Sequence, residues 1–343
     1  MLIEIVLALE IIILFFLLYL IINKIYNSYY EVPSVEFPFK NIYDEDGKKL
    51  NIIAISAPFR EEKHEKLYDK YRKDGLQFCG ISSYLEFPNK IVNPYEDRYH
   101  EKRNHDYVGM VRTWLHCFKE DKYISKFKHI PHLLITEADL KDHKDYYKPD
   151  KSIKKEYDFI YVCLKDNDEC SDSWQSYNRN WTLAKKCLKV MCSKFGLKGL
   201  LVGRVNCEIT DFCDGMMTIV DFLPFHEFQK EMQKCKFIFV PNVSDASPRV
   251  ITEALCYDIP ALVNWNIFGG WHNIKPGISG EFFTNEVDIE DALSKLIHNL
   301  NNYKAREWYT NTSGKYIKGV ELANFLKKNY PEINNKNVNI ATI

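Results

Sequence analysis

The chain has 343 residues, of which 46% are hydrophobic and 14% aromatic. This apolar content is ample for packed cores, which excludes a disordered protein. Lys and Arg number 46 against 47 acidic residues, so the formal net charge of -1 provides no basic field for a nucleic-acid partner. The ten cysteines include no CxxC pair, which argues against a zinc site and favours buried free thiols in a reducing compartment.

The first element in the chain is apolar. The eighteen residues from Ile5 to Ile22 include Glu10 as their only charge and match the thickness of a hydrocarbon core. We expect one membrane-spanning helix within residues 1–23 and a polar, aromatic stem over residues 24–50. A cleaved signal peptide is the alternative, but the basic start and the small-residue cleavage site are missing. Lys24 after the span favours a cytosolic body.

Three Asn-x-Ser/Thr sequons, at Asn180, Asn242 and Asn311, bear on the same question. Asn242 lies between an expected strand and the candidate site described below, where a glycan would block access. The sequon therefore also favours a cytosolic body.

Residues 51–150 alternate between expected strands and helices, which is typical of a small doubly wound domain. We expect strands at 50–56, 76–83 and 131–140, and helices at 60–74 and 107–118.

A second alternating series fills residues 151–305. We expect strands at 157–164, 197–204, 216–224, 236–242 and 260–265, a glycine-bearing loop and short strand at 269–283, and helices at 178–196, 226–235 and 288–300. Two such series predict an α/β protein with two Rossmann-like doubly wound domains facing a cleft, behind the N-terminal transmembrane helix. Residues 306–343 are expected to form a helix and tail that pack back across the domains.

The segment "SDASPRVITEALCYDIPALV" (244–263) contains the main candidate residues for ligand binding. Ser247 is a suitable N-cap and Pro248 suits the first helical position, so a helix should begin there. Its free amides would face the turn after a strand, where an anion is favoured. Asp245 on the entering loop and Glu253 on the second helical turn would flank this point. The arrangement suits a nucleotide diphosphate sugar.

This segment resembles the signature of retaining, family 4 type glycosyltransferases of the GT-B fold, which is E-x7-E followed by A-L-x-x-G-x-P-V. Here it reads Asp245-x7-Glu253, then Ala254, Leu255, Asp258, Pro260 and Val263. "YDFIYVC", "GLLVGR" and "GISGEFF" extend the resemblance over roughly residues 156–300. Asp258 stands in place of the family's helix-ending glycine, and its side chain tolerates the left-handed conformation.

The resemblance implies a role for each matching residue. Glu253 would bind the ribose hydroxyls of the donor, Asp245 would contact the donor sugar, and Arg179 would neutralise the leaving diphosphate. The remaining implied donor contacts are Lys165, Arg204, Ser247, Pro248, Arg249 and Val250.

The resemblance also implies the reaction, which is transfer of a sugar from a nucleotide diphosphate sugar to a glycan, lipid or protein acceptor with retention of configuration. No metal or cofactor is expected, because "DND" at 166–168 has no metal-binding context. A sugar-nucleotide epimerase of the same fold and a non-catalytic binding protein are the alternatives.

Overall fold

The structure is a computed structural model that describes residues 18–19, 32–92, 94–95, 105–207 and 213–343. It separates into two units, Met1–Val35 and Glu36–Ile343, and both sheets belong to the second. Apart from Leu18 and Tyr19, the expected span from Ile5 to Ile22 lies outside the described residues. No helix within the described ranges has both the length and the apolar character to cross a membrane. The anchor therefore stays a prediction.

The first sheet, which we call sheet A, has the order β1-β2-β3-β4-β5. Its strands are β1 (Phe39–Tyr43), β2 (Lys49–Ile55), β3 (Gln77–Ile81), β4 (Thr113–His116) and β5 (His132–Leu134). All neighbours are parallel except β1, which is antiparallel to β2. Its helical elements are α2 (Glu62–Lys73), α3 (Asp121–Ile124) and η2 (Glu137–Leu140).

Two expectations for this region are wrong. The helix expected over residues 107–118 is replaced by turns followed by β4, whose four residues are all buried. Sheet A admits this strand because Gly80 on β3 has no Cβ, and a Cβ there would come within 2.2 Å of the Trp114 ring. In addition, residues 39–43 of the expected stem form β1, because Phe39 and Ile42 are buried in the sheet's packing.

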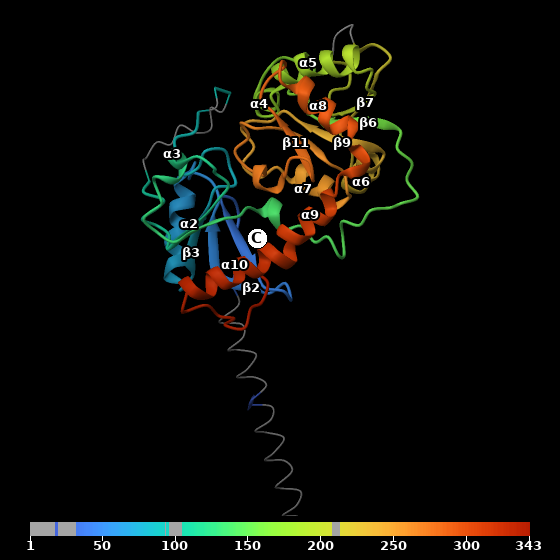
Figure 1. The fold of residues 1–343 in the computed structure, drawn as a ribbon. Coiled ribbons are helices and arrows are strands. Elements are labelled where there is room, and N and C mark those ends of the chain that lie inside the picture. The colour runs from blue at the N-terminus through green and yellow to red at the C-terminus, as the bar shows by residue number, and fades with distance from the viewer. Residues whose placement is uncertain (1–17, 20–31, 93, 96–104, 208–212) are drawn as a thin grey trace, which may run out of the picture. The chain divides into compact units, whose positions relative to one another are not determined.

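The C-terminal segment packs on both sheets. Its helices are α9 (Ala305–Thr312), which packs on the second sheet, and α10 (Lys315–Asn329), which packs on sheet A. Leu322 and Leu326 of α10 share a hydrophobic core with β2, β3 and β4 (Figure 1). The tail then returns to the first strand, where Tyr43 and Thr342 exchange two backbone hydrogen bonds of 2.8 and 2.9 Å.

The second sheet, sheet B, is parallel throughout and has the order β11-β10-β9-β6-β7-β8. Its strands are β6 (Tyr157–Val162), β7 (Gly199–Val202), β8 (Met217–Val220), β9 (Cys235–Val240), β10 (Ala261–Asn264) and β11 (Gly280–Phe283). This order is that of the Rossmann fold, in which successive strands are added on one side of the first strand and then, from the fourth strand on, on its other side. Here these strands are β6 and β9, and ligands in such sheets bind at the carboxyl ends of that pair.

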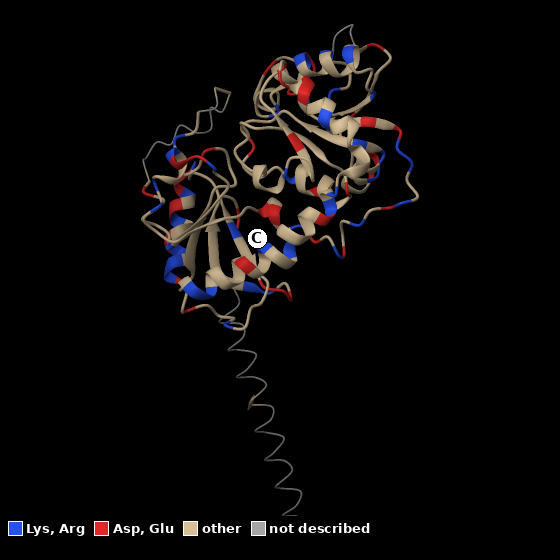
Figure 2. Ribbon diagram, viewed as in Figure 1, with Lys and Arg blue, Asp and Glu red and all other residues tan. Residues whose placement is uncertain are grey.

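Helices cover both faces of sheet B, as expected for a doubly wound domain. The helical elements are α4 (Trp174–Asn178), α5 (Trp181–Lys189), a π-helical turn (Val190–Lys194), α6 (Phe225–Gln233), α7 (Arg249–Cys256), η5 (Trp271–Asn273), α8 (Ile289–His298) and η6 (Leu300–Asn302). Residues of α5 and α8 form one core against the sheet, and residues of α6, α7 and α9 form the other. Basic and acidic residues are interspersed along these helices (Figure 2), in agreement with the near-zero net charge.

The cysteines differ from the expectation of free thiols. Cys170 is bonded to Cys207, and Cys192 is bonded to Cys213. The other six cysteines are free and buried, so the expectation holds for them alone.

Candidate functional site

An ion pair joins the segments that follow β6 and β9, the two neighbouring strands between which the strand order of sheet B reverses. Arg179 follows α4 in the connection from β6, and Asp245 lies on the loop after β9. Arg179 Nη1 lies 2.5 Å from Asp245 Oδ2, which also accepts a hydrogen bond of 3.1 Å from Asn242 Nδ2. Two of the residues assigned to catalysis from the sequence are thus in direct contact. The Arg179 side chain is still 34% exposed, which leaves it accessible to a ligand.

Helix α7 begins close to this pair, but one residue later than the sequence predicts. Pro248 precedes the first helical residue, Arg249, and no side chain caps the helix. Ser247 faces another partner, because its Oγ accepts a 3.2 Å hydrogen bond from the backbone of Ala138 in η2. The orphan backbone donors at this end are therefore not taken by a cap.

The other expected donor contacts on this turn differ in exposure. Arg249 is exposed, whereas Val250 is half-buried and packs against the core beneath α7. At the far end of the helix Asp258 has φ of 60°, the left-handed conformation expected from its place in the motif. Its Oδ1 accepts a 2.9 Å hydrogen bond from the Arg306 backbone, which supports that turn.

A glycine pair packs against the loop that precedes α7. A Cβ at Gly269 would lie 1.9 Å from the backbone oxygen of Ala246, and a Cβ at Gly270 would lie 2.5 Å from Pro248 Cγ. Gly270 also has φ of +74°. Only glycine allows this close approach of backbone to backbone. The pair thereby fixes the position of the loop that carries Asp245.

Glu253, on the second turn of α7, has a partner that the sequence did not single out. Lys141 Nζ lies 2.6 Å from Glu253 Oε1, and both side chains are only 10% exposed. Lys141 also donates a 3.3 Å hydrogen bond to the hydroxyl of Tyr147. Burial, and then the charge of Glu253, raise the pKa of Tyr147. Lys141 follows directly after η2, so this pair links the segment after sheet A to α7.

A buried carboxylate next to Lys141 was also missed. Asp139 in η2 is fully buried and accepts hydrogen bonds from His272 Nε2 at 2.9 Å and Asn273 Nδ2 at 2.7 Å. Burial alone would raise the pKa of Asp139, but the charge and hydrogen bonds of these partners and of Thr136 lower it overall. Asp139 therefore holds η2 against the loop that follows the glycine pair. The sequence offered no signal for this, because the partners are more than a hundred residues apart.

The other two basic residues implied as donor contacts, Lys165 and Arg204, have partners outside the motif. Lys165 pairs with the exposed Asp168 at 2.7 Å. Arg204 is fully buried, with its guanidinium 4.4 Å from the Trp181 ring centre, and it donates to Cys163 Sγ and Ser176 Oγ. Among the described residues neither Lys165 nor Arg204 bonds to Asp245 or Glu253, so their role in donor binding stays a prediction.

The "DND" segment is used for local structure. Asp166 accepts two backbone hydrogen bonds at the start of α4, from Gln175 and Ser176, and Asp168 pairs with Lys165. Within the described part of the chain, no three His, Cys, Asp or Glu side chains are placed to hold a metal ion.

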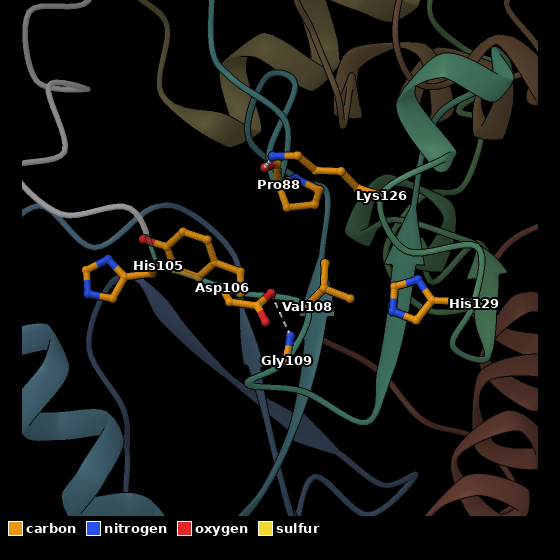
Figure 3. A pocket seen from close by; sticks show the side chains of 8 residues that line it. Pro88, His105, Asp106, Val108, Gly109, Lys126 and His129 are labelled. Carbon is orange, nitrogen blue, oxygen red and sulfur yellow. Dashed lines mark hydrogen bonds between the residues drawn. The ribbon is translucent and has the colours of Figure 1, made fainter.

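Figure 3 shows a pocket of about 320 Å³ away from these residues. It is lined by segments that precede β4 and β5, including Asp106, whose Oδ1 accepts a 3.0 Å hydrogen bond from Gly109, and by Lys126 and His129. Pro88, which follows β3, completes the lining, and neither Arg179 nor Asp245 is part of it. Among the first-domain histidines, His116 and His132 lie 3.3 Å apart between ring nitrogens.

Comparisons with known proteins identify the fold. No protein-family model matches the chain, and no curated protein matches its sequence. Among solved structures, it is similar to TarM (TM-score 0.51, 12% identity, 76% of this chain and 50% of that one). It is also similar to a glycosyltransferase from Rickettsia africae (TM-score 0.51, 13% identity, 82% of this chain and 75% of that one). A third similar structure is Anabaena Alr3699/HepE in complex with UDP-glucose (TM-score 0.52, 11% identity, 76% of this chain and 74% of that one). The chain spans only half of the length of TarM.

These similarities, together with the two parallel sheets, show that the chain has the GT-B fold of glycosyltransferases, as the sequence motif predicts. The identities lie near one residue in eight, so the similarity establishes the fold and leaves the reaction to be argued from the site.

Proposed function

We propose that the protein is a glycosyltransferase that moves a sugar from a nucleotide diphosphate sugar to a glycan, lipid or protein acceptor. The observation that carries this proposal is the Arg179–Asp245 pair, which lies after β6 and β9, where the strand order of sheet B reverses. Glu253 follows on the adjoining helix, at the spacing of the glycosyltransferase motif. Solved relatives in fold include a complex with UDP-glucose, which supports a nucleotide sugar as the donor.

Each motif carboxylate is held by a cation, and each of the two ion pairs keeps polar atoms for a ligand. Glu253 binds Lys141 through Oε1, and its Oε2 makes no hydrogen bond among the described residues. Arg179 binds Asp245 through Nη1, and its Nε and Nη2 are likewise uncommitted in the described part of the chain. In the proposal, Glu253 Oε2 accepts from a ribose hydroxyl, and the open side of the guanidinium donates to the diphosphate.

The proposed reaction retains the configuration of the sugar. The bond between the sugar C1 and the diphosphate oxygen breaks, the acceptor oxygen attacks C1 from the same face, and the acceptor proton passes to the departing phosphate. No enzymic base is required in this scheme. Arg179 and the amides at the start of α7 would stabilise the charge that develops on the diphosphate, which substitutes for a metal ion.

The place of the enzyme in the cell is a separate part of the proposal. A helix within residues 1–23 would hold the body at a membrane, where lipid-linked or protein-linked acceptors concentrate. This rests on the sequence alone. The predicted cytosolic side rests on Lys24 and on the sequon at Asn242, and the two disulfides are an observation against it.

A thermal-shift screen of nucleotide sugars against the full-length protein tests the proposal. The true donor should raise the melting temperature of wild type, since a ligand at 100 times its Kd adds about 2.7 kcal/mol. Glu253→Gln should lose this shift, and Asp168→Ala, which removes an exposed carboxylate from the same domain, should keep it.

Turnover is then measured with the donor so identified. Slow release of the nucleoside diphosphate without acceptor supports a transferase, whereas an epimerised nucleotide sugar would contradict it. Binding that Glu253→Gln leaves unchanged, without turnover, would indicate a binding protein instead.

A further inference from the structure

The two disulfides both lie in the first half of the sheet B domain. Cys170 and Cys207 join the segment after β6 to the segment after β7, with Cα atoms 5.6 Å apart. Cys192 in the π-helical turn is joined to Cys213, which precedes β8, with Cα atoms 5.3 Å apart. Both separations lie in the usual range for bonded cysteines. Each bridge closes a loop in a domain that already has two hydrophobic cores.

Structural disulfides form and persist in oxidising compartments. The two disulfide loops interleave in sequence but share no cysteine, so each is a separate indication. The remaining six cysteines are buried and unpaired, which shows that the pairing is selective and not a general consequence of the cysteine content. The chain therefore has the cysteine pattern of a protein that folds outside the reducing cytosol.

The three sequons differ in whether a glycan could be attached. The glycan bonds to the side-chain nitrogen of asparagine. Asn180 Nδ2 donates to the backbone oxygen of Pro241 at 3.1 Å, and Asn242 is 3% exposed with its Nδ2 bound to Asp245. Asn311 lies in the last turn of α9, is exposed, and makes no side-chain hydrogen bond among the described residues. Of the three sequon asparagines, Asn311 is the one that is exposed and has no side-chain hydrogen bond among the described residues.

We infer that residues 36–343 fold in an oxidising, glycosylating compartment and carry one N-linked glycan, at Asn311. The buried Asn242 weakens the sequence argument for a cytosolic body, because that sequon is not expected to be used on either side of the membrane. In disulfide formation each pair passes two electrons and two protons to a disulfide oxidant. In glycosylation an oligosaccharide on a lipid diphosphate is the donor. Its C1–O bond breaks, a C1–Nδ2 bond forms on Asn311, and the amide proton leaves with the lipid diphosphate.

The glycan is tested by expressing the full chain in eukaryotic cells and treating the extracted protein with an enzyme that removes N-linked glycans. Wild type should show a single mobility step on treatment, and Asn311→Gln should show none. Thr182→Ala, which removes only the sequon of Asn180, should behave as wild type. Absence of the step in wild type, or its survival in Asn311→Gln, would overturn the inference. Because Asn311 is exposed, its replacement should leave folding intact.

The disulfides are tested on the same material by denaturing it without reductant and alkylating the free thiols. Six alkylated cysteines are expected before reduction and ten after it. Peptide mapping should recover Cys170 linked to Cys207 and Cys192 linked to Cys213. Ten alkylated cysteines before reduction would overturn the inference. Neither readout uses catalytic activity, so the inference and the proposed function can fail independently.

Discussion

The pair formed by Lys141 and Glu253 should behave as a buried ion pair whose members depend on each other. Lys141→Met leaves the carboxylate without its partner, and Glu253→Leu leaves the ammonium unpaired. Because both side chains are only 10% exposed, each single change should lower the free energy of unfolding by about 3–5 kcal/mol. The double variant places methionine against leucine and should recover much of that loss.

The expected shift in melting temperature follows from the size of the unit. The entropy of unfolding is about 2.1 cal/mol/K per residue, so if residues 36–343 unfold together, 3–5 kcal/mol corresponds to about 5–8 °C. Chemical denaturation of wild type, both single variants and the double variant gives the coupling energy. Asp168→Ala is the matched control, because Asp168 is exposed in its pair with Lys165 and its removal should leave the free energy of unfolding nearly unchanged. If the two single changes add within about 0.5 kcal/mol, the pair does not act as a unit and the reasoning is refuted.

Three further predictions concern other parts of the site. Arg179→Ala should lower kcat about 10²–10³-fold through loss of one preorganised donor, measured as released nucleoside diphosphate, and a loss under threefold would contradict its role. Gly269→Ala should destabilise the protein and weaken donor binding, because its Cβ would meet the backbone oxygen of Ala246. Denaturation measures the loss of stability and the thermal shift measures the loss of donor binding. Wild-type values in both assays would argue against tight packing at Gly269. Burial, and then the charge of His132, lower the pKa of His116 to about 4, so the folded state resists a proton that the unfolded chain takes up near pH 6.5. Stability should therefore fall as the pH drops from 6.5, by about 2 kcal/mol at pH 5, and His116→Gln should reduce this fall in pH-dependent denaturation.

Much of sheet B could be predicted from the sequence because its strands are continuous apolar runs separated by turn residues. The same patterns placed Asp245 and Glu253 at the start of α7, and the left-handed Asp258 followed from the motif. The prediction of a helix at residues 107–118 was wrong because a short run of aromatic and apolar residues is compatible with both a helix and a strand. The burial of Trp114 beneath Gly80 decides for a strand, and that contact is not visible in sequence.

The partners of the site residues could not be predicted, for a different reason. Lys141 stands in a run of charged residues in which no spacing distinguishes it from solvated lysines. Arg204 follows β7 and was expected to contact the donor, yet the Trp181 ring and the polar atoms of Cys163 and Ser176 surround it. In both cases tertiary packing gives the side chain a role that local sequence does not encode.

The return of the tail to the first strand affects when the protein can fold. Tyr43 on β1 pairs with Thr342, and the core of sheet A is completed by Leu322 and Leu326 of α10. A ribosome must therefore release almost the entire chain before the first sheet can bury its apolar face. Sheet B, whose strands lie between residues 157 and 283, has all of its strands available earlier. The domain made second is thus free to fold first, and until synthesis ends the nascent sheet A is the part that depends on chaperones.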